Sequence, residues 1–184
     1  QLSSRRMRAY RKDLQIVFQD PYSSLSPRMT VEQIVGEGLK LHYSHLSKAQ
    51  RYERIVKTLN EVGLDENALW RYPHEFSGGQ KQRIVVARAL TMQPDFLVLD
   101  EPVSNLDVSI QAQIINLLNE LQNELGLSYL FISHDMGVVQ HMCDELAVLY
   151  LGKIVEQADR HSLFSHPLHP YTWSLLSAVP SIYS

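Results

Sequence analysis

The sequence predicts an α/β fold built around a parallel sheet. In the second half of the chain, short apolar runs alternate with segments of helical periodicity, and such alternation needs the crossover connections that are typical of parallel strands. The first half adds a block of helices with clear capping patterns. At 184 residues, of which 45% are hydrophobic, the chain is long enough for one domain with a real core.

Short apolar runs bounded by polar or turn-forming residues mark the strands. The predicted strands are residues 14–18, 96–99, 129–132, 146–150 and 154–155. A turn-rich stretch that begins at Pro21 follows the first strand, and a turn at Gly152-Lys153 joins the last two.

A hydroxyl residue followed three positions later by glutamine forms a capping box, which predicts that a helix begins there. Such boxes occur at Thr30, Ser47 and Ser77. A longer helix, capped by Asp107 or Ser109, is predicted to end at Gly126. Shorter helices are predicted at residues 136–142 and 171–178, and the His- and Pro-rich residues 161–170 are expected to be irregular.

Composition excludes several classes of protein. The formal net charge of -3 does not suit a chain that coats nucleic acid or an acidic membrane. Cys143 is the single cysteine, so we expect a buried structural thiol and no internal disulfide; a redox switch would lack a second thiol. No apolar run approaches the roughly 20 residues that span a bilayer, so we expect any membrane association to go through a partner protein.

Polar side chains follow three of the predicted strands. Gln19 follows the first, Asp100-Glu101 the second, and His134 comes two residues after the third. In an open parallel sheet, ligands bind at the carboxyl ends of the strands, so these side chains are expected to share one edge. Each of them alone is explained as a cap of the next turn, but three together favour a site.

Asp100 and Glu101 carry the clearest chemistry at this edge. An aspartate at the end of an apolar strand can hold Mg²⁺ directly or through water. A neighbouring glutamate can then polarise an attacking water, and phosphoryl transfer needs little beyond positioning and charge neutralisation. The alternative is that both carboxylates only cap the following turn.

The segment Ser77-Gly78-Gly79-Gln80 opens a predicted helix with two glycines. Its free backbone N–H groups and the helix dipole suit a phosphate, and glycines let the backbone approach an anion closely. Taken alone, an ordinary capped helix explains the same residues.

Five segments together resemble the ABC ATPase family. Residues 77–83 (Ser-Gly-Gly-Gln-Lys-Gln-Arg) resemble its signature motif, and residues 96–102 (Phe-Leu-Val-Leu-Asp-Glu-Pro) its Walker B strand. Residues 104–107 (Ser-Asn-Leu-Asp) resemble the D-loop, His134 the switch histidine and Gln19 the Q-loop glutamine. Family members commonly have alanine where this chain has Asn105, a departure from which we expect little consequence.

The resemblance implies a partial P-loop NTPase fold, with a RecA-like parallel sheet and an inserted α-helical subdomain. It implies four parts: residues 1–28 with a strand and the Q-loop, residues 29–86 as the helical signature subdomain, residues 87–160 as the core with Walker B, D-loop and H-loop, and residues 161–184 as a C-terminal tail. No string G-x-x-x-x-G-K-[ST] occurs in the chain. Since the resemblance places this P-loop before residue 1, and residue 1 is not a methionine, we expect a chain cut from a longer one that alone neither binds nor hydrolyses ATP appreciably.

Within the family, residues 71–76 (Arg-Tyr-Pro-His-Glu-Phe) and 166–172 (His-Pro-Leu-His-Pro-Tyr-Thr) resemble the ATPase subunits of oligopeptide, dipeptide and nickel importers. The histidines of the tail suggest an alternative, a metal site at His161, His166 and His169. Their irregular spacing, the intervening prolines and the absence of a completing Cys or carboxylate disfavour it.

The family resemblance also implies a role for each matching residue. Gln19 and Asp100 would serve Mg²⁺, Glu101 would activate the attacking water, and His134 would contact the γ-phosphate of ATP. A second ABC ATPase subunit would pack head to tail, as a homo- or heterodimer. Its nucleotide would meet the residues Ser77, Gly78, Gly79 and Gln80, and Asp107 would connect the two sites.

The implied partners are transmembrane permease subunits and a separate substrate-binding protein, with no nucleic acid. The implied location is peripheral, on the cytoplasmic face of the inner membrane. Two alternatives stay open: a soluble ABC ATPase that acts on ribosomes or DNA, and a truncated fragment that does no chemistry.

Overall fold

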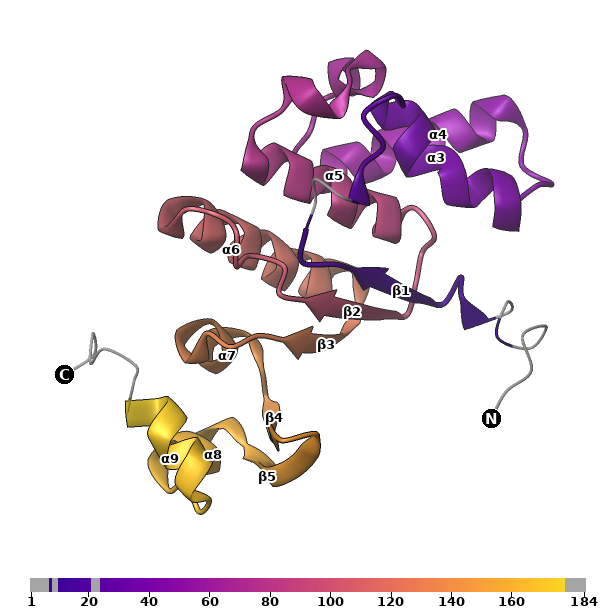
Figure 1. Cartoon of the computed structure of the whole chain (residues 1–184). Helices are drawn as coiled ribbons and strands as arrows, with labels where there is room; N and C mark the ends of the chain where they lie inside the picture. The colour runs from indigo at the N-terminus through magenta and orange to yellow at the C-terminus, as the bar shows by residue number, and fades with distance from the viewer. Residues whose placement is uncertain (1–6, 8–9, 21–23, 178–184) are drawn as a thin grey trace. The chain divides into compact units, whose positions relative to one another are not determined.

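The computed structural model describes residue 7, residues 10–20 and residues 24–177 (Figure 1). The chain divides into two compact units, Gln1–Ile132 and Ser133–Ser184, and each is described by itself. Parts of two predicted segments, the turn from Pro21 and the helix end at Ala178, lie outside the described residues.

The first unit contains the predicted parallel sheet. Its strands are β1 (Leu14–Val17), β2 (Phe96–Asp100) and β3 (Ser128–Ile132), in the order β1-β2-β3. Val17 pairs with Leu99 and Asp100 pairs with Ile132, both in parallel register. The carboxyl ends of the three strands therefore lie at one edge of the sheet.

The two faces of the sheet differ because side chains alternate along each strand. Val17, Leu97 and Leu99 point to one face and are fully buried. Helices α5 (Gly78–Leu90) and α6 (Val108–Leu125) cover this face, and the Tyr129 hydroxyl donates to the Leu118 carbonyl of α6 across 2.8 Å (Figure 1). Half-exposed apolar side chains occupy the opposite face: Leu14, Ile16, Leu130 and Ile132.

Helices α3 (Val31–His42), α4 (Lys48–Glu61) and α5 pack together through apolar side chains such as Leu39, Leu59 and Ile84. All three begin at the predicted capping boxes. Two short 3-10 helices that the sequence did not indicate, η1 (Glu66–Trp70) and η2 (Pro73–Glu75), lead from α4 to the start of α5. Helix α6 begins after Asp107 and ends at Gly126, whose φ of +66° is left-handed, as predicted for a glycine cap.

The second unit is a small α/β arrangement. Its elements are α7 (Met136–Met142), β4 (Glu145–Tyr150), β5 (Lys153–Asp159), α8 (Arg160–Ser165) and α9 (Pro170–Ser177). Strands β4 and β5 form an antiparallel hairpin, and Tyr150 pairs with Lys153 around the turn. Leu163 is fully buried in the unit's apolar cluster.

Two expectations for this second unit need correction. Residues 161–170 were expected to be irregular, but α8 forms because the Asp159 carboxylate accepts the Ser162 amide, 3.0 Å away, and caps the helix. Cys143 is only half-buried, and partial burial is the main cause that raises the pKa of its thiol. Among the described residues, no helix is both long and apolar enough to cross a bilayer.

Candidate functional site

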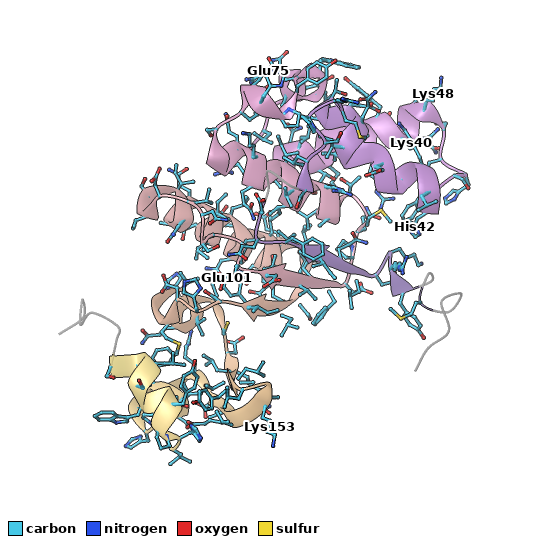
Figure 2. All side chains as sticks on the ribbon, in the orientation of Figure 1. Lys40, His42, Lys48, Glu75, Glu101 and Lys153 are labelled. Atoms are coloured by element: carbon cyan, nitrogen blue, oxygen red, sulfur yellow. The ribbon has the colours of Figure 1, made fainter. Side chains whose placement is uncertain are left out.

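The candidate site lies at the carboxyl edge of the three-stranded sheet. Asp100 is the last residue of β2, and Gln19 comes two residues after β1. Glu101, which is labelled in Figure 2, follows Asp100. The structure thus brings together three of the predicted site residues in the first unit. Gln19 is exposed, and both carboxylate residues are half-buried.

Glu101 has an unusual backbone conformation. Its φ is +51°, in the left-handed region that is unfavourable for residues other than glycine. Its backbone N–H donates to the carbonyl of Ile132 at the end of β3, 2.9 Å away, which helps to hold this conformation. A left-handed residue costs roughly 1–3 kcal/mol and clusters at functional sites. The strand end therefore carries strain at the residue expected to act on water.

A polar turn connects Glu101 to Gln19. The Ser104 hydroxyl donates to the Glu101 carbonyl at 3.2 Å and accepts the Gln19 side-chain amide at 3.4 Å. Asn105 donates its own side-chain amide to the Gln19 carbonyl, also at 3.4 Å. The sequence placed both connecting residues in the D-loop match but indicated no role for either, although Asn105 departs from the family pattern.

A pocket of about 620 Å³ opens beside this turn. Its lining includes Phe18, Gln19 and Asp100, together with Arg88 from α5. The Arg88 guanidinium donates to the Ser24 carbonyl at 3.0 Å and pairs with the Glu37 carboxylate at 3.2 Å. Both a carboxylate residue and a guanidinium residue therefore line the pocket.

The first turn of α5 lies at the same end of the unit as the strand ends, and α6 also begins there (Figure 1). The Ser77 hydroxyl accepts the Gln80 amide at 3.4 Å, and the Gln80 side chain accepts the Ser77 amide at 3.0 Å. Gly79 approaches α6 closely: a Cβ atom on it would lie 2.6 Å from Cγ2 of Ile110. The amides of Gly78 and Gly79 have no carbonyl partner within the helix, so they can donate hydrogen bonds to an anion.

Two predicted site residues remain, Asp107 and His134. Asp107 is the exposed N-cap of α6, and its side chain makes no capping hydrogen bond. His134 belongs to the second unit, just before the N-cap of α7. That cap, Asp135, accepts the amides of Gly137 at 2.9 Å and Val138 at 3.2 Å.

The polar side chains at the strand ends have the oxygen ligands that a nucleotide with bound Mg²⁺ requires. Asp100 and Gln19 offer the carboxylate and amide oxygens that Mg²⁺ prefers, and Mg²⁺ commonly takes one or two protein ligands beside phosphate oxygens. Nowhere in the described part of the chain do three His, Cys, Asp or Glu side chains gather as a metal site, and this includes the tail histidines.

The tail has a structural anchor that sequence reasoning did not foresee. The Glu156 carboxylate of β5 accepts the backbone amides of Leu168 at 2.8 Å and His169 at 2.9 Å. His169 in turn accepts the Tyr171 amide at Nδ1, 3.1 Å away. This fixes the His-Pro segment just before α9.

Family models and curated proteins match this chain over most of its length. The family model described as "ABC transporter" matches residues 1–104, and the model described as "Oligopeptide/dipeptide transporter, C-terminal region" matches residues 155–184. A protein of Brucella ovis described as a peptide import ATP-binding protein is 57% identical over 180 residues, which cover 98% of this chain and 56% of that protein. The chain thus spans little more than half the length of this curated relative.

Two solved structures share the fold. One is cbiO1 from Clostridium perfringens, described as part of the ABC transporter complex cbiONQ, with a TM-score of 0.80 and 32% identity; the match covers 89% of this chain and 64% of cbiO1. The other is an ATP-binding cassette in a dimeric, post-hydrolysis state bound to ADP and Pi. Its TM-score is 0.73 at 28% identity, over 86% of this chain and 68% of that one.

Proposed function

This chain belongs to the ABC transporter family, and we propose that it works within an ATP-hydrolysing subunit that drives the import of peptides. The observation that carries the proposal is the strand-end cluster, in which Glu101 is held in a left-handed conformation beside Asp100 and linked through a polar turn to Gln19. The relative bound to ADP and Pi supports a nucleotide as the ligand.

In the proposed reaction, water attacks the terminal phosphate of ATP, the bond to this phosphate breaks and ADP leaves. Asp100 and Gln19 would hold Mg²⁺, which would neutralise charge on the phosphates. Glu101 accepts the proton of the attacking water and orients it, which is the work of a general base. His134 is the proposed contact for the terminal phosphate. The left-handed backbone at Glu101 sets the direction in which its side chain leaves the chain.

A second ATPase subunit completes the proposed site. The first turn of α5, with Ser77, Gly78 and Gly79, is exposed or half-buried and can face a nucleotide held by that subunit. The Gln80 side chain supports this turn through the capping box. Asp107, exposed and free of a capping bond within α6, is the proposed link between the two sites. The dimeric relative supports such an arrangement.

The proposed membrane partners are permease subunits, supplied with peptide by a separate binding protein. The match of residues 155–184 to the oligopeptide/dipeptide transporter C-terminal region favours peptide import over a ribosome- or DNA-directed ATPase. We place the subunit at the cytoplasmic face of the membrane. The helical segment proposed to move during closure is residues 29–86, and its last bound falls within α5, which continues to Leu90.

The test is uptake of labelled oligopeptides into vesicles that contain the full-length subunit and its permease partners, with the peptide-binding protein added. Wild type is compared with Glu101→Gln, and Glu124→Gln, an exposed change on α6, is the matched control. Removing a positioned base typically lowers the rate by about 10²–10⁴-fold. We expect Glu101→Gln to lower the rates of ATP hydrolysis and peptide uptake by this factor and to leave ATP binding intact. Glu124→Gln should behave as wild type.

Near-normal hydrolysis by Glu101→Gln would contradict the role of this glutamate. ATP hydrolysis without any peptide uptake, but with stimulation by ribosomes or DNA, would replace peptide import with the rival class of soluble ATPase.

A further inference from the structure

Gly79 and Ile110 determine how closely two helices approach. Gly79 is the second residue of α5, and Ile110 is the third residue of α6. A methyl group on Gly79 would lie 2.6 Å from Cγ2 of Ile110. Carbon atoms pack best at about 3.5–4.0 Å, so any side chain at position 79 would force the helix starts apart.

Ile110 cannot easily move out of the way. Its Cγ2 atom is bonded directly to Cβ, and a β-branched side chain in a helix has one strongly preferred χ1 rotamer. The start of α6 is itself held, because the Gln111 side chain donates to the Leu106 carbonyl at 2.9 Å. Leu106 donates its amide to the Val103 carbonyl at 3.1 Å, within the turn that follows Glu101.

We infer that Ile110 is a positioning residue for the start of α5. Its Cγ2 methyl sets the distance between the two helix starts, and position 79 is glycine because of this contact within the chain. The inference rests on the proposed function, in which the first turn of α5 faces a nucleotide and Asp107 lies three residues before Ile110.

The contact gives Gly79 a different explanation from the one the sequence suggested. From the sequence, glycine at 79 was expected to leave room for an anion or for the partner's phosphates. If position 79 must be glycine to leave room for the ligand, a change at Ile110 cannot restore activity to a variant that has a side chain at 79. If position 79 must be glycine because of the contact with Ile110, removing the Cγ2 methyl of Ile110 will restore activity to that variant.

The experiment uses the full-length subunit with its partners and compares Gly79→Ala alone with two double variants. Gly79→Ala/Ile110→Ala removes Cγ2, whereas Gly79→Ala/Ile110→Val is the matched control because valine keeps both γ-carbons on Cβ and loses only Cδ1. The readouts are the thermal midpoint of unfolding, ATP-dependent dimerisation in a Glu101→Gln background, and KM and kcat for ATP.

A displacement of about 1 Å at a reacting centre can lower a rate about 10²-fold, so we expect Gly79→Ala to reduce dimerisation and kcat/KM by about 10- to 100-fold. Gly79→Ala/Ile110→Ala should recover most of this loss, and Gly79→Ala/Ile110→Val should not. Ile110→Ala alone should raise KM more than it lowers kcat, because it loosens the nucleotide-facing turn and leaves Glu101 in place.

Two results would overturn the inference: Gly79→Ala with wild-type dimerisation and kinetics, or a Gly79→Ala/Ile110→Ala variant that is as impaired as Gly79→Ala. The second result would show that the ligand needs the space, and it would leave the proposed ATPase function intact. Failure of the proposed function itself is detected separately, by normal hydrolysis in Glu101→Gln.

Discussion

Asn105 donates its side-chain amide to the backbone carbonyl of Gln19 across 3.4 Å, and so connects the turn after β2 to the segment after β1. The Gln19 side chain returns to the same turn by donating to Ser104 at 3.4 Å. Two long, exposed hydrogen bonds thus restrain a residue proposed to face Mg²⁺. At the sequence level this asparagine was expected to have little consequence, so its contact gives it a testable role.

Asn105→Ala is expected to lower kcat for ATP hydrolysis by about two- to fivefold in the full-length subunit. The loss corresponds to one exposed hydrogen bond of about 0.5–1 kcal/mol. The thermal midpoint should barely change, since the bond is at the surface. Asn116→Ala, an exposed change on α6, is the control. Equal kcat in both variants would show that the Gln19 segment does not need this restraint.

Arg71→Ala is expected to lower the free energy of unfolding by about 1 kcal/mol. The Arg71 guanidinium lies 4.2 Å from the ring centroid of buried Phe76 and 3.7 Å from the Glu75 carboxylate. Arg71→Lys should recover little, because an ammonium group lacks the planar face. Urea unfolding measures both changes. Lys57→Ala, which removes only a surface pair at 3.6 Å, should cost about 0.5 kcal/mol or less, and an equal loss there would refute the stacking argument.

Leu151→Asn is expected to stabilise the protein by about 0.5–1 kcal/mol. Leu151 and Gly152 form the two-residue turn between β4 and β5, with φ values of +48° and +75°. Two left-handed residues define a hairpin turn that strongly prefers Asn-Gly. Thermal unfolding is the measurement. Leu149→Asn, at an exposed position within β4, should instead destabilise, because asparagine disfavours strands; a lower midpoint for Leu151→Asn would contradict the turn argument.

Glu156→Gln is expected to lower the unfolding midpoint at neutral pH and to remove part of its acid sensitivity. The pKa of Glu156 is lowered from its ordinary 4.5 by the nearby Thr172 hydroxyl and by the Leu168 and His169 amides. The Thr172 hydroxyl lies close to the carboxylate without meeting the geometry of a regular hydrogen bond. A lowered folded pKa stabilises the fold above the unfolded pKa, and this stability is lost as pH falls through the folded pKa.

The difference between wild type and Glu156→Gln should therefore be largest near pH 7 and should shrink below about pH 4.5. Denaturant midpoints at pH 7 and pH 3.5 measure it, with Glu145→Gln, an exposed change in β4, as the control. A difference that stays constant between the two pH values would show that the carboxylate charge is not involved.

Local rules account for what the sequence predicted well. The capping boxes at Thr30, Ser47 and Ser77 depend on residues three positions apart, and each helix begins where its box predicts. The parallel sheet follows from alternating apolar runs, and it places Asp100 beside the last residue of β3. Helix α8 was missed because the His-Pro composition outweighed the Asp159 cap, a local signal that was present.

Contacts between distant residues could not be predicted. No spacing rule relates Gly79 to Ile110 or Gln19 to Asn105, because these distances depend on how helices and strands pack. The left-handed φ of Glu101 is equally invisible in a strand ending Asp-Glu, where a glycine would have been the usual signal. The role of His134 stays a prediction.

The backbone of Glu101 also affects how this protein can be engineered. At a φ of +51°, glycine would relieve the strain that glutamate carries, while it would remove the proposed base. Selection for heat resistance alone would enrich glycine at this position and discard hydrolysis with it. A variant library for this subunit should therefore hold codon 101 fixed and score turnover alongside melting temperature.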